Sequence, residues 1–163
     1  MSVKNGFKNL LRTAFGKLGY SLTKKGFAGS AGLYDIDEEI NQTYQLVKSF
    51  TMTSAVRIAS LCTAVKYLAT NKIEGDIVEC GVWKGGSAMA AIDTLVKCGD
   101  TSRGIYLYDT YEGMSQPTPT DVDFDGMPAS DLLKISDRKD QASVWCISSL
   151  DEVKKNIGSL PYP

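Results

Sequence analysis

Two acidic residues and four glycines lie between positions 75 and 87, in a spacing typical of a ligand-binding turn. The segment reads Gly-Asp-Ile-Val-Glu-Cys-Gly-Val-Trp-Lys-Gly-Gly-Ser. Ile77 to Cys80 has the pattern of a short buried strand, and the glycines that follow predict a turn into a helix that begins at Ser87. Such a turn gathers backbone N–H groups and a helix N-terminus at one point. Glu79 stands at the carboxyl end of the strand, the edge at which ligands bind in open α/β sheets.

The glycines of this turn do not have the spacing of a dinucleotide-binding fingerprint. The pattern is E-x-G-x-x-x-G-G, whereas the dinucleotide fingerprint is G-x-G-x-x-G. Gly81 permits a sharp turn, and Gly85 and Gly86 let the backbone approach a ligand without an intervening Cβ. A tight strand-to-helix turn with no ligand is the alternative. The carboxylate of Glu79 favours a ligand site, because an acid at a strand end needs a partner.

A second acid, Asp109, directly follows the next predicted strand, Ile105 to Tyr108. In Rossmann-like sites an acid at this place holds ribose hydroxyls. A solvated strand-end aspartate is the alternative, and the glycine turn beside it favours the ribose role. Trp83, inside the turn, either packs over a ligand or wedges the turn against neighbouring structure, and the sequence leaves both open.

Helical periodicity and capping residues predict the elements that hold these side chains. A helix from Ser87 to Cys98, closed by Gly99, predicts a right-handed β–α–β unit with parallel strands. A long polar segment from Thr110 to Ser130 has the composition of a lid. Four more helices are expected. Asp35 or Asp37 would cap the first, which carries Ile40, Tyr44 and Val47, and Thr53 or Ser54 would cap the second, which carries Ile58, Leu61, Cys62, Val65 and Leu68 and ends near Asn71. The third would run from Asp131 to Ile135, and the fourth would begin at Ser149, with Glu152 at capping-box spacing, and stop at Gly158.

Composition excludes several classes of function for these 163 residues. The net charge of -1 gives no electrostatic case for nucleic acid. The sequence has no histidine, which excludes Ser-His-Asp and Cys-His catalysis and any zinc site with a histidine ligand. The four cysteines are widely spaced and no signal peptide precedes them, so we expect reduced thiols, with Cys62 in the core, and a cytoplasmic location. No apolar run approaches the roughly 18 residues of a spanning helix.

The stretch from residue 4 to residue 22 has the pattern of a basic amphipathic helix. Such a helix could make weak contact with an anionic membrane surface. Docking on its own domain, or on a second subunit in a homo-oligomer, is the favoured alternative. Because residues 24–33 have the glycine content of a linker, we divide the chain into an N-terminal helix and linker, 1–34, and a main domain, 35–163.

Three segments together resemble the macrocin O-methyltransferase family of S-adenosylmethionine-dependent class I methyltransferases, which includes the mycinamicin sugar O-methyltransferases. The segments are Phe50 to Ser54, Gly75 to Ser87 and Tyr108 to Met114; Asp121 to Gly126 and Ser149 to Ile157 also fit. The resemblance covers about residues 35–163, and the Glu79 to Ser87 run is highly specific. It implies an α/β, Rossmann-like class I methyltransferase fold, of which this chain holds the N-terminal helices and the first strands of the parallel sheet.

The resemblance also implies where the methyl donor, S-adenosylmethionine, binds. Glu79 to Ser87 would surround its methionine part, Asp109 would hold its ribose, and Thr51 to Ser54 would close over it. The 110–130 loop would help to cover donor and acceptor. The cofactor-binding residues expected on this basis are Thr51, Met52, Thr53, Glu79, Cys80, Gly81, Trp83, Gly85, Gly86, Ser87, Asp109 and Thr110.

The family transfers the methyl group to a sugar hydroxyl with Mg²⁺ and an aspartate base, and those acids belong past residue 163. We therefore expect a fragment without catalytic residues or metal ligands, whose small-molecule acceptor, a sugar or other natural product, cannot be read from the sequence. Asp121, Asp123 and Asp125 mimic the start of a calcium loop, but Leu132 replaces the glutamate of the twelfth position and Pro128 interrupts the loop. A solvated acidic lid is the better interpretation.

Two other functions stay open from the sequence: a truncated, non-catalytic module that binds S-adenosylmethionine, and a nicotinamide-dependent oxidoreductase. Only two strands can be recognised, whereas a doubly wound sheet has about five or six. The strand from Ile77 to Cys80 would then have an open hydrogen-bonding edge, so we expect the isolated chain to be poorly stable and prone to aggregate.

Overall fold

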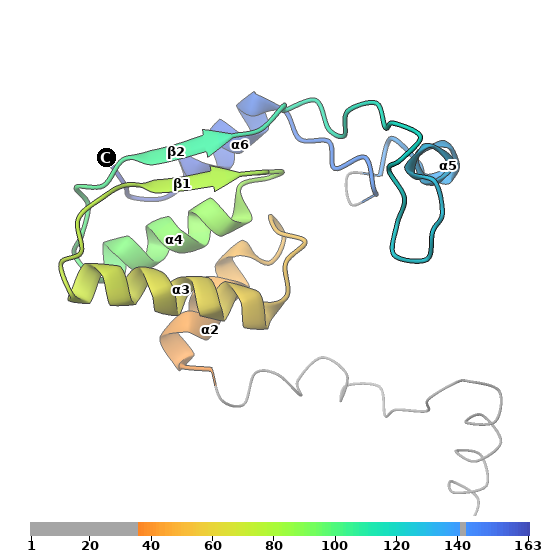
Figure 1. The fold of residues 1–163 in the computed structure, drawn as a ribbon. Coiled ribbons are helices and arrows are strands. Elements are labelled where there is room, and N and C mark those ends of the chain that lie inside the picture. Colours follow the sequence, from red (N-terminus) through yellow and green to blue (C-terminus); the bar gives the residue numbers. More distant parts are fainter. Residues whose placement is uncertain (1–35, 141–142) are drawn as a thin grey trace, which may run out of the picture. The chain divides into compact units, whose positions relative to one another are not determined.

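A computed structural model describes residues 36–140 and 143–163, which belong to one unit, Ile36–Pro163. The amphipathic stretch 4–22, the linker 24–33 and the candidate cap Asp35 lie outside the described residues, so the expectations for them stay predictions. The elements are α2 (Glu38–Val47), α3 (Ala55–Thr70), β1 (Ile77–Cys80), α4 (Gly86–Lys97), β2 (Ile105–Tyr108), α5 (Ala129–Ile135) and α6 (Leu150–Ile157) (Figure 1).

All five helices and both strands expected in this part of the chain are present; two helix starts differ, and α4 ends at Lys97, one residue before the expected Cys98. Helix α4 begins at Gly86, one residue before the expected Ser87, because Gly85 is its N-cap in a left-handed conformation, with φ +87°. Helix α5 begins at Ala129 instead of Asp131. Its N-cap is Pro128, whose φ of -58° already suits a helix start.

Most of the expected helix caps form as the sequence indicates. Asp37 caps α2 by accepting a backbone N–H at 2.9 Å, and the Ser149 hydroxyl caps α6 at 3.2 Å. Gly99 follows α4 with φ +71° and donates its N–H to the Val96 carbonyl at 3.0 Å. Ser54 is the N-cap of α3, but its side chain accepts no hydrogen bond there.

The two strands form the expected parallel pair, joined through α4. Ile77 lies opposite Ile105, and Cys80 lies opposite Tyr108. Figure 1 shows both arrows pointing the same way, with α4 below them. This is the β–α–β unit of an α/β, Rossmann-like sheet, with two strands among the described residues. Because the strands are parallel, the turn after β1 and the residue after β2, Asp109, meet at one edge of the sheet.

Burial differs between the two faces of this sheet. Ile77 and Ile105 pack against a cluster of buried residues from α3 and α4. On the opposite face Val78 is 60% exposed and Tyr108 is 61% exposed, and Cys80 is exposed as well. The expectation that β1 is buried is therefore wrong for one face, because no described element packs on that side. The expected instability of an open strand edge stays a prediction.

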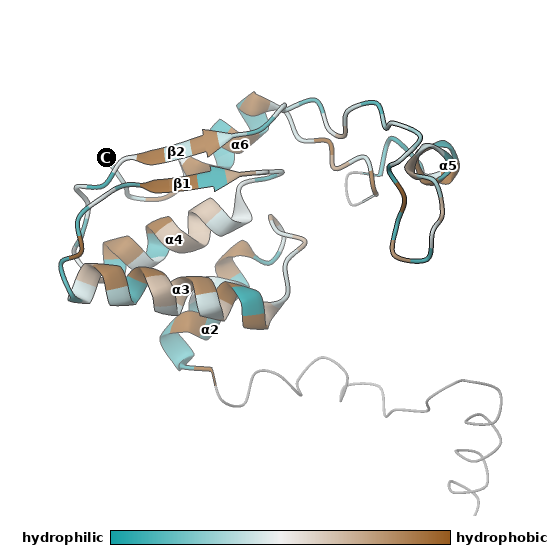
Figure 2. Ribbon diagram, in the orientation of Figure 1, coloured by the Kyte–Doolittle hydropathy of each residue, from teal (hydrophilic) through white to brown (hydrophobic). Residues whose placement is uncertain are grey.

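Helix α4 is the centre of the core. Eight of its twelve residues are buried, and small alanines let α2 and α3 pack against it. Figure 2 colours most of the α4 ribbon from white to brown, which marks its apolar composition. Cys62, on α3, is 1% exposed and belongs to the same cluster, so the expectation of a core thiol is confirmed. The buried position of α4 fixes its N-terminus, and with it the turn from β1. Within the described residues, no helix has both the length and the apolarity to cross a membrane.

Candidate functional site

The turn between β1 and α4 depends on two glycines in left-handed conformations. Gly81 has φ +88° and donates its N–H to the Tyr108 carbonyl at 2.9 Å, which extends the strand pairing by one residue. A Cβ on Gly81 would meet nothing within 4 Å, so this part of the turn faces open space. Gly85 has φ +87°, and a Cβ there would lie 3.3 Å from Cδ1 of Ile157 on α6. Gly81 has open space beside it, whereas Gly85 is packed against protein.

Gly86 allows a close approach between α4 and the segment before α3. Its N–H donates to the Phe50 carbonyl at 3.0 Å, and a Cβ on Gly86 would lie only 2.5 Å from that oxygen. Gly85 and Gly86 were expected to let the backbone approach a ligand, and in the structure both are in close contact with other parts of the protein. Their contact with a cofactor stays a prediction. The Phe50 contact holds Thr51 and its neighbours beside the turn.

Asp109 connects the end of β2 to the turn after β1. Its Oδ2 accepts the N–H groups of Val82 at 2.6 Å and Trp83 at 3.1 Å, and its Oδ1 accepts the N–H of Tyr111 at 3.0 Å. Partial burial alone would raise the pKa of Asp109, but the backbone hydrogen bonds outweigh it and the pKa is lowered. Asp109 is therefore an ionised carboxylate that fixes the turn, a role that no local signal in the sequence indicates.

Strained backbone surrounds Asp109. Three non-glycine residues near it have left-handed conformations: Trp83 (φ 48°), Tyr111 (φ 56°) and Cys146 (φ 48°). The first two donate their N–H groups to Asp109, and its charge contributes, after burial, to the raised pKa of Cys146. Such conformations persist only where surrounding contacts enforce them, and they cluster at functional sites. The strain agrees with a site at this edge of the sheet.

Sequence reasoning missed Tyr111. Its hydroxyl donates to the Leu107 carbonyl at 3.2 Å, so the residue folds back over the end of β2. Burial raises the pKa of Tyr111, and the charges of Asp109 and Glu79 raise it further. The phenol therefore lies near both acids of the site and stays protonated. In the sequence, the only signal that could have marked Tyr111 as a site residue was its position two residues after Asp109.

Glu79 carries a partly buried carboxylate at the N-terminus of α4. Burial raises its pKa, whereas hydrogen bonds from Ser87 and Ala88 lower it and the charge of Asp109 raises it. Its Oε2 is buried and has no hydrogen-bond partner among the described residues. An unpaired buried acceptor is costly in a folded protein, so this oxygen is a candidate acceptor for a donor from a bound molecule. The atom of Glu79 that lacks the expected partner is therefore Oε2.

A cavity of about 290 Å³ lies between α3, β1 and the start of α4. Its polar lining is Thr53, Arg57, Glu79 and Ser87, and its other walls are aliphatic. Three of the four were predicted as site residues. Arg57 was not, because nothing in the sequence singles out an arginine in the first turn of a helix.

Other predicted residues lie in a second pocket, of about 600 Å³, which Thr51, Met52 and Trp83 line together with lysines. The Lys84 ammonium lies 5.0 Å from the centre of the Trp83 ring. Six predicted residues line neither cavity: Cys80, Gly81, Gly85, Gly86, Asp109 and Thr110. Cys80 is on the uncovered face of the sheet, and the Thr110 hydroxyl donates to the Gly113 carbonyl at 2.8 Å.

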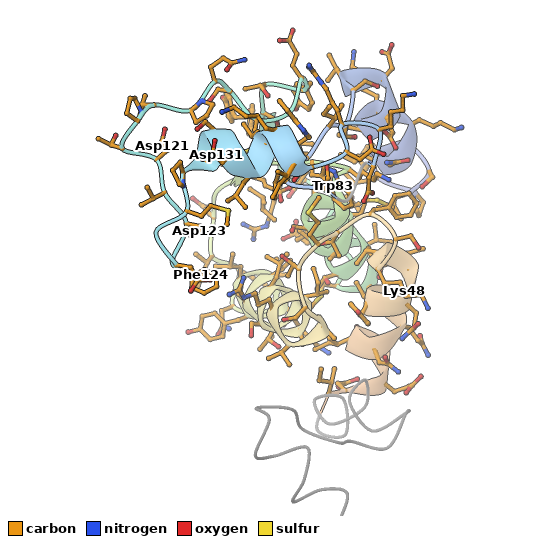
Figure 3. All side chains as sticks on the ribbon, turned by 90° about the vertical axis from the view of Figure 1, so that its right-hand side faces the viewer. Lys48, Trp83, Asp121, Asp123, Phe124 and Asp131 are labelled. Carbon is orange, nitrogen blue, oxygen red and sulfur yellow. The ribbon has the colours of Figure 1, made fainter. Side chains whose placement is uncertain are left out.

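The acidic loop before α5 is separate from the site. Figure 3 shows Asp121, Asp123 and Phe124 at the left of the view and Lys48 at the right, with Trp83 between them. Asp121 accepts the N–H of Thr118 at 2.7 Å, and Asp123 accepts that of Asp125 at 2.9 Å. Within residues 36–140 and 143–163, no three acidic or cysteine side chains gather in a way that could hold a metal ion.

Comparisons with known proteins agree on one family. The family model of macrocin-O-methyltransferase (TylF) matches residues 34–157. An 8-demethyl-8-(2,3-dimethoxy-alpha-L-rhamnosyl)-tetracenomycin-C 4'-O-methyltransferase of Streptomyces olivaceus is 36% identical over 66 residues, which are 40% of this chain and 25% of that protein. A demethyldecarbamoylnovobiocin O-methyltransferase of Streptomyces niveus is 27% identical over 107 residues, which are 66% of this chain and 37% of that protein.

The solved structure of the O-methyltransferase NovP has a TM-score of 0.47 and 26% identity, covering 68% of this chain and 42% of that one. This chain spans between a quarter and two fifths of the length of the two Streptomyces enzymes. The family model, in contrast, matches most of the present sequence. On that match, the chain belongs to the macrocin O-methyltransferase family.

Proposed function

We propose that this chain provides the methyl-donor site of an S-adenosylmethionine-dependent O-methyltransferase. The observation that carries the proposal is the unpaired Oε2 of Glu79, buried at the N-terminus of α4 beside a cavity. The ammonium group of S-adenosylmethionine would donate a charge-assisted hydrogen bond to this unpaired oxygen of Glu79. Family membership supports the same donor, since the related proteins are O-methyltransferases by name.

Asp109 is proposed to hold the ribose of the donor while it also fixes the turn. A carboxylate has about four acceptor sites. Backbone N–H groups use two sites on Oδ2 and one on Oδ1, and the Thr110 hydroxyl lies 3.4 Å from Oδ1. Because that hydroxyl makes its shorter bond to the Gly113 carbonyl, a ribose hydroxyl could take its place at Oδ1. The same hydrogen bonds keep Asp109 ionised, which suits it to accept from a ribose.

Around this core, the remaining residues are proposed to enclose the donor. Gly81 leaves open space at the turn, and the Phe50 contact with Gly86 holds Thr51, Met52 and Thr53 at the rim. Methyl transfer asks the protein mainly to position the sulfonium donor against a nucleophilic oxygen. Rigid backbone contacts of this kind supply such positioning.

We assign no described residue to activation of the acceptor hydroxyl. The family implies Mg²⁺, but the described acids do not gather into a cluster of three that fits such an ion. The residues in the described part of the chain therefore fit the organic donor and do not fit the metal. For the acceptor we propose a hydroxyl of a sugar or other small metabolite, on the printed names of the two Streptomyces relatives.

The proposal is tested by calorimetric titration of the full chain with S-adenosylhomocysteine and, separately, with NAD. We expect heat of binding from S-adenosylhomocysteine alone. Glu79→Gln should weaken that binding about tenfold, because it removes a charged acceptor. Asp123→Asn, in the acidic loop, is the matched control and should bind as the wild type does. Binding of NAD without S-adenosylhomocysteine would overturn the proposal.

A further inference from the structure

Two opposite charges line the cavity between α3 and β1. Arg57 and Glu79 are the only charged side chains in its lining. Arg57 is the third residue of α3 and is exposed. No carboxylate of the described residues lies within salt-bridge distance of its guanidinium. A cation and an anion that share a cavity without pairing to each other leave room for a ligand with both charges.

The size and walls of the cavity suit one end of a cofactor. Small-molecule sites usually measure about 300–1,000 Å³, and this cavity of about 290 Å³ is at the lower limit. Leu61, Ala91 and Leu107 form apolar walls between the charged residues. Apolar walls suit a short methylene chain, and they strengthen the interaction of charges placed between them.

The placement of the two charges on different walls of the cavity also fits the ammonium and carboxylate groups of an α-amino acid. Glu79 lies at the N-terminus of α4 and has an unpaired oxygen, so an ammonium group is favoured beside it. Arg57 approaches from α3, on another wall. Its guanidinium is a planar fork that matches a carboxylate with two parallel hydrogen bonds. An amino-acid end in the opposite orientation would bring like charges together.

We propose that Arg57 is a specificity-determining residue, which selects the amino-acid end of the methyl donor by binding its carboxylate. This inference rests on the proposed function. It predicts that the chain distinguishes S-adenosylmethionine from decarboxylated S-adenosylmethionine, which keeps the ammonium and sulfonium groups but lacks the carboxylate. The discrimination depends on Arg57, whereas Glu79 acts on both ligands.

The test measures the affinities of both donors for the full chain and its variants by calorimetry. Wild type is expected to bind S-adenosylmethionine about tenfold or more tightly than the decarboxylated donor. Arg57→Gln should lose this preference and leave the affinity for the decarboxylated donor within about twofold, and Arg57→Lys should restore part of the preference. Lys66→Gln is the matched control: it removes a positive charge from the same helix, where Lys66 lies 3.8 Å from Glu39 and lines no part of the cavity.

The possible results separate the two proposals. Loss of the preference in Arg57→Gln, with circular dichroism like that of wild type, supports the role of Arg57. Equal loss of affinity for both donors, or no change for either, overturns that role and leaves the proposed function in place. If wild type binds neither donor, the proposed function falls and the role of Arg57 falls with it.

Discussion

Two segments of this chain combine acids with glycine, and they are held in different ways. The turn from Glu79 to Gly86 is fixed by distant partners: Asp109 binds the N–H of Val82 at 2.6 Å, and Phe50 binds that of Gly86 at 3.0 Å. The acidic loop from Asp121 to Gly126 is held by neighbours in sequence. Asp123, for example, accepts the N–H groups of residues two and four positions later.

This difference decides which segment can do chemistry. Long-range contacts hold the backbone of the turn within a buried core, so its groups are positioned before any ligand arrives. In the acidic loop each hydrogen bond is local and exposed, and water competes for it. A glycine-and-acid motif is therefore informative only when the rest of the fold holds it.

The largest expected effect comes from adding one methyl group at each segment. Gly86→Ala would place a Cβ 2.5 Å from the Phe50 carbonyl, and neither backbone can yield cheaply. We expect the free energy of unfolding to fall by about 3 kcal/mol or more. Gly126→Ala is the control: its φ of +83° disfavours alanine, but a Cβ there meets nothing within 4 Å, so about 1 kcal/mol is expected.

Urea unfolding followed by circular dichroism measures both changes. If the two variants unfold at the same urea concentration, Gly86 does not form the close approach that holds the turn. That result would contradict the conclusion that distant contacts hold the turn more firmly than local ones hold the acidic loop.

Local signals in the sequence were sufficient for most of the architecture. The two strands, the parallel pairing, and the caps at Asp37, Gly99 and Ser149 follow from residue spacing and capping chemistry. These features depend on a few consecutive residues, or on a general rule of chain connection. Asp109 was likewise placed correctly at the sheet edge.

Features that depend on distant partners could not be read from the sequence. The Phe50 carbonyl behind Gly86, the fold-back of Tyr111 and the place of Arg57 opposite Glu79 all need the three-dimensional arrangement. The same holds for the one-sided burial of β1, since periodicity does not say how many faces of a strand are covered.

An intermediate effect is expected from neutralising one acid in each segment. Asp109→Asn removes a charged acceptor of three backbone N–H groups. Because the side chain is only partly buried, we expect a loss of about 1 kcal/mol at neutral pH, with weaker binding of S-adenosylhomocysteine. Asp123→Asn, whose bonds are local and exposed, should change the free energy of unfolding by less than about 0.5 kcal/mol.

The effect of Asp109 should depend on pH in a defined direction. Its pKa is lowered in the folded protein from the ordinary 3.8, so folding favours the ionised form. The stabilisation is complete above the unfolded pKa and is lost as the pH falls through the lowered folded pKa. The difference between wild type and Asp109→Asn in urea unfolding should therefore shrink in acid. A difference that grows in acid would contradict the hydrogen bonding assigned to this carboxylate.

The smallest effect is expected from the largest side chain of the acidic loop. Phe124 is 96% exposed, so Phe124→Ser removes almost no buried apolar surface, and the free energy of unfolding should change by less than about 0.5 kcal/mol. Phe50 packs against the core beside the turn, and Phe50→Ser, measured in the same urea series, should cost about 3 kcal/mol. Equal costs for the two variants would mean that the loop is packed against protein in solution. The acidic loop would then share the long-range contacts that here distinguish the turn.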